Sequence, residues 1–274
     1  MMMAVVTSSA PHAARTRAGM LILRGLRRIL VWVVGFAVAI LGWAVLIKLT
    51  QAPPYMAAGP PAAYRALLKD WSVIVDALRV TMVETGVGLT VSTALALGLS
   101  TLFVAAPTAE RALMPMALVF RSVPVVAIGP LIVLMVGRGL STSIVCVTIV
   151  TFFPVLVMAT RGFRSLSPEM EELFRVHGAS MSQVFRYARI PNAVPFIFTG
   201  LRMAVAKGVL GAMLAEWLTG SEGLGHLLVF AESRREMGLL WATLVVATGS
   251  AVVVFQLTVA AERAVQRRTS TGRA

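Results

Sequence analysis

Long apolar stretches without charge alternate with short charged segments along this chain. Four stretches of 19 to 25 residues contain no Asp, Glu, Lys or Arg. Two further apolar regions are interrupted by isolated charges, the first by Arg121 and the second by Arg202, Lys207 and Glu216. Because a helix needs about 20 apolar residues to cross a bilayer, the pattern predicts six transmembrane helices. Their expected ranges are 29–49, 82–104, 113–136, 140–161, 195–219 and 239–261.

The composition agrees with a membrane protein and excludes several other classes. Hydrophobic residues make up 58% of the chain and charged residues 14%, against about 25% charged in soluble domains. Such a chain is not disordered, and the single Cys146 excludes an internal disulfide framework. The net charge of +13 superficially suggests nucleic acid. The basic residues lie between apolar stretches rather than on one polar face, so we expect contact with membrane lipid and no nucleic acid.

Lys and Arg residues in the loops predict the orientation of the helices. With six spans both ends lie on one side, and that side collects fifteen Lys and Arg residues against seven on the other. The excess predicts that both termini are cytoplasmic. The first apolar stretch is longer than a typical cleavable signal, and more spans follow it, so we interpret it as an uncleaved anchor. The expected organisation is a cytoplasmic tail over 1–28, a transmembrane domain over 29–262 that includes the loop 162–194, and a second cytoplasmic tail over 263–274.

Two connections on the opposite, external side have recognisable content. The segment 50–70 is rich in proline, and we expect it to lead into a short interfacial helix over 63–78. The segment 220–238 is predicted to be a loop in which three glycines form turns. These glycines are Gly220, Gly223 and Gly225.

The longest cytoplasmic loop, 162–194, is predicted to contain two short helices. Ser167 fits the N-cap of the first helix, and Gly178 can end it in a left-handed conformation. The second helix is expected over 181–190 and stops at Pro191, because proline lacks an amide donor. A solvated linker is the alternative interpretation, but a connector needs only a few residues. The helix–glycine–helix pattern favours a docking element for a cytoplasmic partner.

This loop resembles the EAA loop of binding-protein-dependent ABC transporter permeases. The family pattern has a Glu followed by Ala-Ala, then a glycine, a long gap and a hydrophobic residue before Pro. Leu173 and Phe174 stand here where the family has its two alanines. The resemblance extends over about residues 77–265 and implies that the loop couples the permease to an ATPase. The residues carried over to this coupling role are Glu172, Gly178, Ala179, Ser180 and Pro191.

The resemblance implies an all-α polytopic membrane protein with about six transmembrane helices and a cytoplasmic helix-turn-helix coupling loop. It further implies a permease subunit of an ATP-driven importer in the bacterial inner membrane, which carries a small solute and catalyses no reaction itself. The expected partners are two copies of an ABC ATPase, an extracytoplasmic solute-binding protein and a second copy of the permease.

Further motifs resemble those of nitrate, sulfonate and taurine permeases. Permeases for pyrimidine precursors of thiamine look similar in the same places, so the solute stays open between these classes. The motifs are Arg121-Ser122-Val123-Pro124 before Gly129-Pro130, Phe152-Phe153-Pro154, Ala215-Glu216-Trp217 and Gly223-Leu224-Gly225.

The chain carries no motif for ATP hydrolysis or other catalysis. None of its three lysines follows a glycine-rich loop, so the phosphate-binding pattern of an ATPase is absent. The three histidines are isolated, and the sequence has no metal-ligand spacing and no nucleophile elbow. We therefore expect no cofactor, no metal and no enzymatic activity. The rival classes are an ATP-independent transporter or channel and a membrane-embedded enzyme. Secondary carriers often show inverted repeats, and this sequence has no repeat. An enzyme would need a catalytic constellation within the spans, and none is evident in the sequence.

Prolines and charges inside the apolar regions mark a candidate translocation pathway. Interrupted helices are tolerated in a bilayer where the backbone lines a cavity. A charge near the bilayer centre is costly and is usually functional or paired. Packing kinks and structural ion pairs are the alternatives at these positions. The candidate pathway residues are Pro124, Pro130, Pro154, Lys207 and Glu216.

Overall fold

The structure is a computed structural model that describes residues 34–51, 53, 57–122 and 124–271. These residues are mostly helical and include no strand, which confirms the predicted all-α class. The chain divides into two units, Met1–Ala62 and Ala63–Ala274. In the first unit the principal described element is the apolar helix Val34–Thr50, which overlaps the first predicted span. The predicted tail over 1–28 lies outside the described residues.

The second unit contains the long helices of the fold. Four helical stretches are long and apolar enough to cross a membrane, and the spans predicted over 82–104, 140–161, 195–219 and 239–261 lie within them. In chain order the helices are α2 (Pro60–Lys69), α3 (Trp71–Ala105), α4 (Pro107–Ser122), α5 (Val125–Val136), α6 (Leu140–Arg164), α7 (Pro168–Val176), α8 (Met181–Val184), the π-helical turn η1 (Phe185–Arg189), α9 (Ile190–Thr219), α10 (Leu224–Ser233) and α11 (Met237–Thr271).

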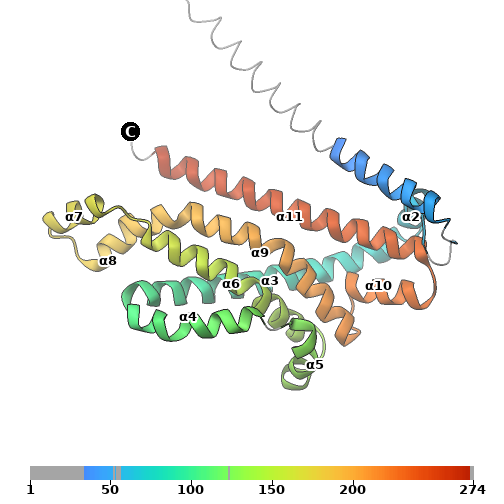
Figure 1. The fold of residues 1–274 in the computed structure, drawn as a ribbon, viewed down its shortest axis with the longest axis horizontal. Helices are drawn as coiled ribbons and strands as arrows, with labels where there is room; N and C mark the ends of the chain where they lie inside the picture. The colour runs from blue at the N-terminus through green and yellow to red at the C-terminus, as the bar shows by residue number, and fades with distance from the viewer. Residues whose placement is uncertain (1–33, 52, 54–56, 123, 272–274) are drawn as a thin grey trace, which may run out of the picture. The chain divides into compact units, whose positions relative to one another are not determined.

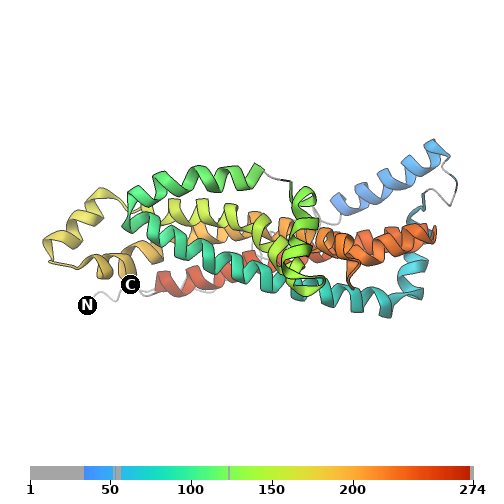
Figure 2. The same cartoon turned by 90° about the horizontal axis from the view of Figure 1, so that it is seen from below.

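Helix α6 lies at the centre of the second unit. It packs along α9 and α3, and α11 packs against α9 and α3 in turn. The four long helices run alongside one another in both views (Figure 1, Figure 2). The short helices α7 and α8 lie at one end of this bundle, whereas α10 lies at the opposite end (Figure 1). Helix α5 lies across the bundle beside α6 and α9 (Figure 2).

Small residues let the long helices approach closely. A Cβ atom on Gly88 of α3 would lie 2.6 Å from the Cβ atom of Val147 in α6. One on Gly200 of α9 would lie 3.0 Å from the Cα atom of Val155. The Thr148 hydroxyl also donates a hydrogen bond of 3.2 Å to the Gly88 carbonyl. Close backbone approach between small residues is a common mode of transmembrane helix association, and it packs α3 and α9 tightly against α6.

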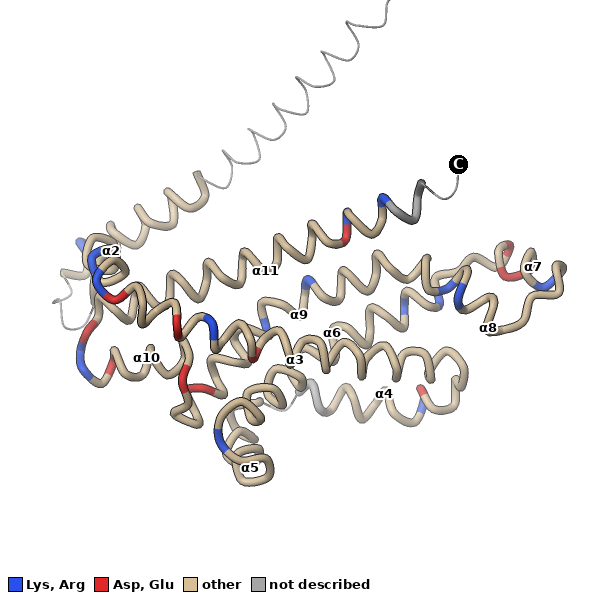
Figure 3. Tube along the Cα trace, turned by 180° about the vertical axis from the view of Figure 1, so that it is seen from behind, with Lys and Arg blue, Asp and Glu red and all other residues tan. Residues whose placement is uncertain are grey.

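Many charged residues lie toward the two ends of the second unit, and a smaller number lie along the middle of the bundle (Figure 3). Arg202, which interrupts an apolar region in the sequence, forms an ion pair with Glu262 that joins α9 to α11. Arg164 and Glu110 form a similar pair between α6 and α4. These charges therefore join neighbouring helices. The side chain of Arg121 lies outside the described residues.

The region 113–136, predicted as one span, is divided into two helices. Helix α4 ends at Ser122 and α5 begins at Val125, with Pro124 in an extended conformation at the start of α5 (φ −67°, ψ 117°). Proline has no amide donor and disfavours helix in the residue before it. The chain changes direction at this break, so the prediction of a continuous span was wrong.

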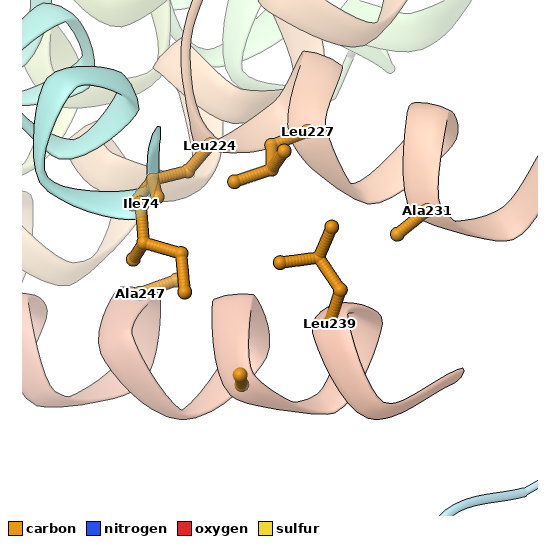
Figure 4. Packing of buried hydrophobic residues seen from close by; sticks show 7 residues of the cluster. Ile74, Leu224, Leu227, Ala231, Leu239 and Ala247 are labelled. Atoms are coloured by element: carbon orange, nitrogen blue, oxygen red, sulfur yellow. The ribbon is translucent and has the colours of Figure 1, made fainter. Parts of the chain in front are cut away.

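The segment 220–238 was predicted to be a loop, but it contains the ten-residue helix α10. Leu224 and Leu227 of α10 pack against Ile74 of α3 and Leu239 of α11 (Figure 4). This apolar contact explains why the segment folds back onto the bundle. Two of its glycines do form turns with positive φ, and the third lies in the first turn of the helix. The turn residues are Gly220 (φ +64°) and Gly223 (φ +139°), and the helical one is Gly225.

The helix predicted over 63–78 is also two elements. Helix α2 ends at Lys69 and α3 begins at Trp71, with Asp70 between them outside the helical conformation (φ −105°, ψ 25°). Residues 71–78 therefore belong to the long helix α3, and the interfacial helix is shorter than predicted.

The helix after Gly178 does not stop at Pro191, contrary to the prediction. Helices α8 and α9 are joined through η1 into one continuous stretch, Met181–Thr219. In the wider π turn the Ile190 amide donates to the Phe185 carbonyl, five residues back. Pro191 then stands in the first turn of α9. A missing amide donor and the bulk of the proline ring are accommodated at this position because the preceding turn is widened.

Candidate coupling and translocation sites

The α7–α8 unit, residues 167–184, is held in shape by side-chain caps at the start of both helices. The Met170 amide donates to the Ser167 hydroxyl at 3.4 Å. Ser180 and Gln183 form a reciprocal capping box: the Ser180 amide donates to Gln183 Oε1 at 2.7 Å and the Gln183 amide donates to Ser180 Oγ at 3.3 Å. Hydrogen bonding from its own amide and from Ser167 also lowers the pKa of the Glu169 carboxyl. Such caps stabilise a short helix by about 1 kcal/mol each.

Gly178 forms the corner between α7 and α8. Its φ is +68°, the left-handed conformation that the sequence predicts. The Gly178 amide donates to the Arg175 carbonyl and the Ala179 amide donates to the Phe174 carbonyl, both at 3.0 Å. This pair of bonds is the Schellman motif of helix C-termini, in which a glycine is strongly preferred. The corner is thus a defined turn.

One ion pair attaches the α7–α8 unit to the start of the long helix α9, and two further contacts join the end of α6 to η1 and α9 beside it. Glu171 of α7 is ion-paired with Arg189 at 2.7 Å. The rings of Phe163 and Phe185 lie 5.1 Å apart, and Asn192 donates to Ser165 Oγ at 2.8 Å. A displacement of α7 would therefore reach η1 and the start of α9 through the ion pair between Glu171 and Arg189, and the two other contacts connect that point to the end of α6.

The outer face of the unit presents apolar side chains beside one acidic residue. We call Glu172, Leu173, Val176 and Met181 the coupling surface. Leu173 is 51% exposed, Val176 78% and Met181 74%, and Glu172 is exposed and has no ion pair in the described part of the chain. Ala179 is half-buried and Ser180 exposed at the corner, whereas Pro191 lies beyond the corner in α9. Exposed apolar residues on a rigid, charged tip are typical of a protein interface.

A cavity of about 260 Å³ lies between α4, α5, α6 and α9. Among the residues that the structure describes, its lining is apolar and aromatic apart from Lys207, the one charged side chain that faces it. Lys207 has no ion pair and no hydrogen bond to another described side chain. Pro154 lines the same cavity together with Phe152 and Phe153. The structure therefore brings two of the predicted pathway residues to one hollow in the bundle.

The other predicted pathway residues do not line this cavity. Pro124 lies next to it, since the following residue, Val125, is part of the lining. Pro130 lies inside α5 and is exposed. Glu216 is fully buried elsewhere in the bundle.

Glu216 connects three helices through hydrogen bonds. Its Oε1 atom accepts from the Thr81 hydroxyl of α3 and its Oε2 atom accepts from the Gly225 amide of α10, both at 2.6 Å. Sequence reasoning missed the role of Thr81, because Thr81 and Glu216 lie 135 residues apart. The local signal for this contact is an isolated Glu near the end of an apolar helix, followed a few residues later by the Gly-x-Gly turn at 223–225.

Comparison with known proteins places the chain among transport proteins. The family model described as binding-protein-dependent transport system inner membrane component matches residues 86–271. A formylaminopyrimidine transport permease of Halalkalibacterium halodurans is 31% identical over 71% of this chain and 76% of its own. A taurine transport system permease of Escherichia coli is 33% identical over 64% of this chain and 60% of its own.

The fold also resembles that of solved transporter subunits. A chain from an inward-facing form of the MetNI methionine ABC transporter superposes with a TM-score of 0.57 at 18% identity. The superposition covers 76% of this chain and 99% of that one.

Proposed function

Because this chain belongs to the family of binding-protein-dependent transport system inner membrane components, we propose an importer in which two copies of it form the pathway. The chain is a membrane-spanning permease subunit of an ATP-driven ABC importer, and it is a transport component rather than an enzyme. In the proposed assembly two ABC ATPase subunits dock at the coupling surface, and an extracytoplasmic binding protein delivers the solute at the opposite end.

The coupling surface carries the proposal for ATPase docking. It is apolar and exposed, it stands on a doubly capped corner, and its anchors lead into α6 and α9. Closure of the ATPase subunits would move the α7–α8 unit as one body, because the caps and the Schellman corner resist deformation. The ion pair between Glu171 and Arg189 and the packing of Phe163 on Phe185 would pass that movement into the bundle.

Dependence on a separate ATPase tests this proposal directly. The sequence has no phosphate-binding loop, so the purified chain alone is expected neither to bind nor to hydrolyse ATP. Expressed with a cognate ABC ATPase subunit, the chain should co-purify with that subunit and with vanadate-sensitive ATPase activity. Specific nucleotide binding by the isolated chain, or solute uptake in cells without any ABC ATPase partner, would favour the rival class of ATP-independent carriers.

We propose that both termini and the α7–α8 unit face the cytoplasm. The excess of Lys and Arg on one side of the predicted spans supports this orientation. The orientation is also the one in which the coupling surface can meet a cytoplasmic ATPase. A cysteine tag at Met1 or at Ala274 is expected to resist an impermeant thiol reagent in intact cells and to react after permeabilisation. Labelling of either tag in intact cells would show that this terminus is external and would contradict the proposed orientation.

We infer that the transported solute is a small molecule with an anionic group, of the nitrate, sulfonate or taurine type. Lys207 supports this inference, because it is the one charged group among the described residues that line the cavity of about 260 Å³, which is otherwise apolar. A pyrimidine precursor of thiamine is the second candidate. Phe152 and Phe153 on the same lining would suit a flat ring, and one relative is a formylaminopyrimidine permease.

Substitution of Lys207 distinguishes these two classes of solute. A binding assay on the partner binding protein first identifies the solute. Lys207→Met should then reduce uptake of an anion by roughly tenfold to a hundredfold, the effect of losing one hydrogen bond to a charged group. Lys207→Arg keeps the charge and should retain most of the uptake. A neutral ligand on the binding protein, with uptake unchanged in Lys207→Met, would establish the pyrimidine alternative instead.

A further inference from the structure

Two acidic side chains are buried against each other in the half of the bundle that carries α10. Glu84 of α3 is 2% exposed and Glu216 of α9 is 0% exposed. The Glu84 carboxyl faces both Glu216 and Ser143 of α6. Neither carboxyl is ion-paired with a Lys or Arg in the described part of the chain. A buried charge without a counter-ion is strongly unfavourable, so this arrangement requires a compensating group.

Glu216, together with Thr81, also has a structural role at the first turn of α10. The residue before this helix, Gly223, has no side chain to cap it. The Gly225 amide donates a hydrogen bond to the Glu216 carboxyl at 2.6 Å. The Leu224 amide donates to the Thr81 hydroxyl at 2.9 Å, and this hydroxyl in turn donates to Glu216. Two of the orphan amides of α10 are thus satisfied by side chains from α3 and α9. The Glu216 carboxyl therefore helps to hold α10 in place.

Hydrogen bonding distinguishes the two carboxyls. Glu216 accepts hydrogen bonds from two donors, the Thr81 hydroxyl and the Gly225 amide. The Oε2 atom of Glu84 and the Oγ atom of Ser143 are buried and have no hydrogen-bond partner in the described structure. Two adjacent carboxyls in an interior site cannot both be ionised and instead share a proton. We propose that Glu84 and Glu216 form a proton-binding site, a carboxyl–carboxylate pair that holds the first turn of α10 against α3 and α9.

A hollow of about 500 Å³ leads to this site. Glu84 is part of its lining, and Arg79 and Glu222 stand on the same lining as the charged groups nearest to it. Inside the bundle, His226 of α10 faces Glu216 and Cys146 of α6 faces Glu84. A proton can therefore exchange between the pair and the hollow. Loss of this proton would leave two adjacent carboxylates that repel each other, and this repulsion would weaken the hydrogen bonds that position α10.

Infrared spectroscopy of the full-length chain in lipid nanodiscs tests the site. A protonated carboxyl absorbs separately from a carboxylate, so the wild type in neutral buffer should show a carboxylic C=O band. The near-isosteric Glu84→Gln should lose that band, and Glu222→Gln, a change on the lining of the hollow, should keep it. Absence of the band in the wild type, or its persistence in Glu84→Gln, would overturn the proposal.

Hydrogen exchange at the first turn of α10 provides a second readout. After correction for intrinsic rates, raising the pH should accelerate exchange of the Leu224 and Gly225 amides in the wild type by roughly tenfold or more, as expected for loss of a charge-assisted bond. Glu84→Gln should abolish this pH response, because Gln stays neutral. Equal responses in both proteins would contradict proton sharing. If protection of these amides from exchange instead required Na⁺, with choline as the control cation, the site would bind a metal cation, and the proposal of a proton-binding site would be rejected.

Discussion

Gly178→Val is expected to abolish solute uptake while leaving the protein in the membrane at normal abundance. Gly178 has a φ of +68°, and a Cβ atom there would meet no other atom within 4 Å. The cost of valine is therefore backbone strain rather than a clash. A β-branched residue at positive φ costs about 1–3 kcal/mol. Because both bonds of the Schellman motif depend on this conformation, the strain should release the corner and decouple α7 from α8.

A matched substitution separates strain at the corner from the simple loss of glycine. Asn tolerates the left-handed region much better than valine, so Gly178→Asn should retain most of the uptake. Membrane abundance, ATPase co-purification and uptake are measured for both variants. Full uptake in Gly178→Val at normal abundance would remove the main support for a coupling role of this corner.

The charge on the coupling surface is expected to matter separately from its shape. Glu172 is exposed and lies outside the first-turn cap of α7, so Glu172→Lys should leave the α7–α8 unit folded. The variant should nevertheless lose ATPase association and uptake, because a positive charge would replace a negative one at the docking surface. Glu172→Lys therefore tests the charge of the coupling surface independently of the turn at Gly178.

The corner could be predicted from the sequence because its determinants are local. Ser167, Gly178 and Ser180 act on amides within three residues of themselves or through their own backbone. The long apolar spans were predictable for a similar reason, since each needs only its own composition. The coupling role of these residues, and of Ala179 and Pro191, stays a prediction.

The features that sequence reasoning missed depend on distant contacts. The break at Pro124 and the widened turn before Pro191 were both signalled by proline, but whether proline ends, bends or only widens a helix depends on the packing around it. Helix α10 forms because Ile74 and Leu239 supply an apolar surface for it. Its cap comes from Thr81 and Glu216, and no local pattern links residues that lie so far apart.

Gly225→Ala is expected to destabilise the whole α3–α9–α10 contact. A Cβ atom on Gly225 would lie 2.1 Å from the carbonyl oxygen of Met213 and 2.8 Å from its carbonyl carbon. These are backbone atoms of α9, so no side-chain rotation can relieve the clash. Helix α10 would have to move away from α9, and the bond from the Gly225 amide to Glu216 would be lost.

The expected loss is about 3–6 kcal/mol, the sum of overpacking and one broken bond to a charged group. Thermal unfolding of the purified chain in nanodiscs measures it, together with membrane abundance in cells. Gly98→Ala is the control, because a Cβ atom on Gly98 of α3 would meet nothing within 4 Å. That variant should be neutral or stabilised by up to about 1 kcal/mol, the gain in helix propensity. If Gly225→Ala unfolded at the same temperature as Gly98→Ala, the close packing of α10 on α9 would be refuted, and with it the long-range cap supplied by Glu216.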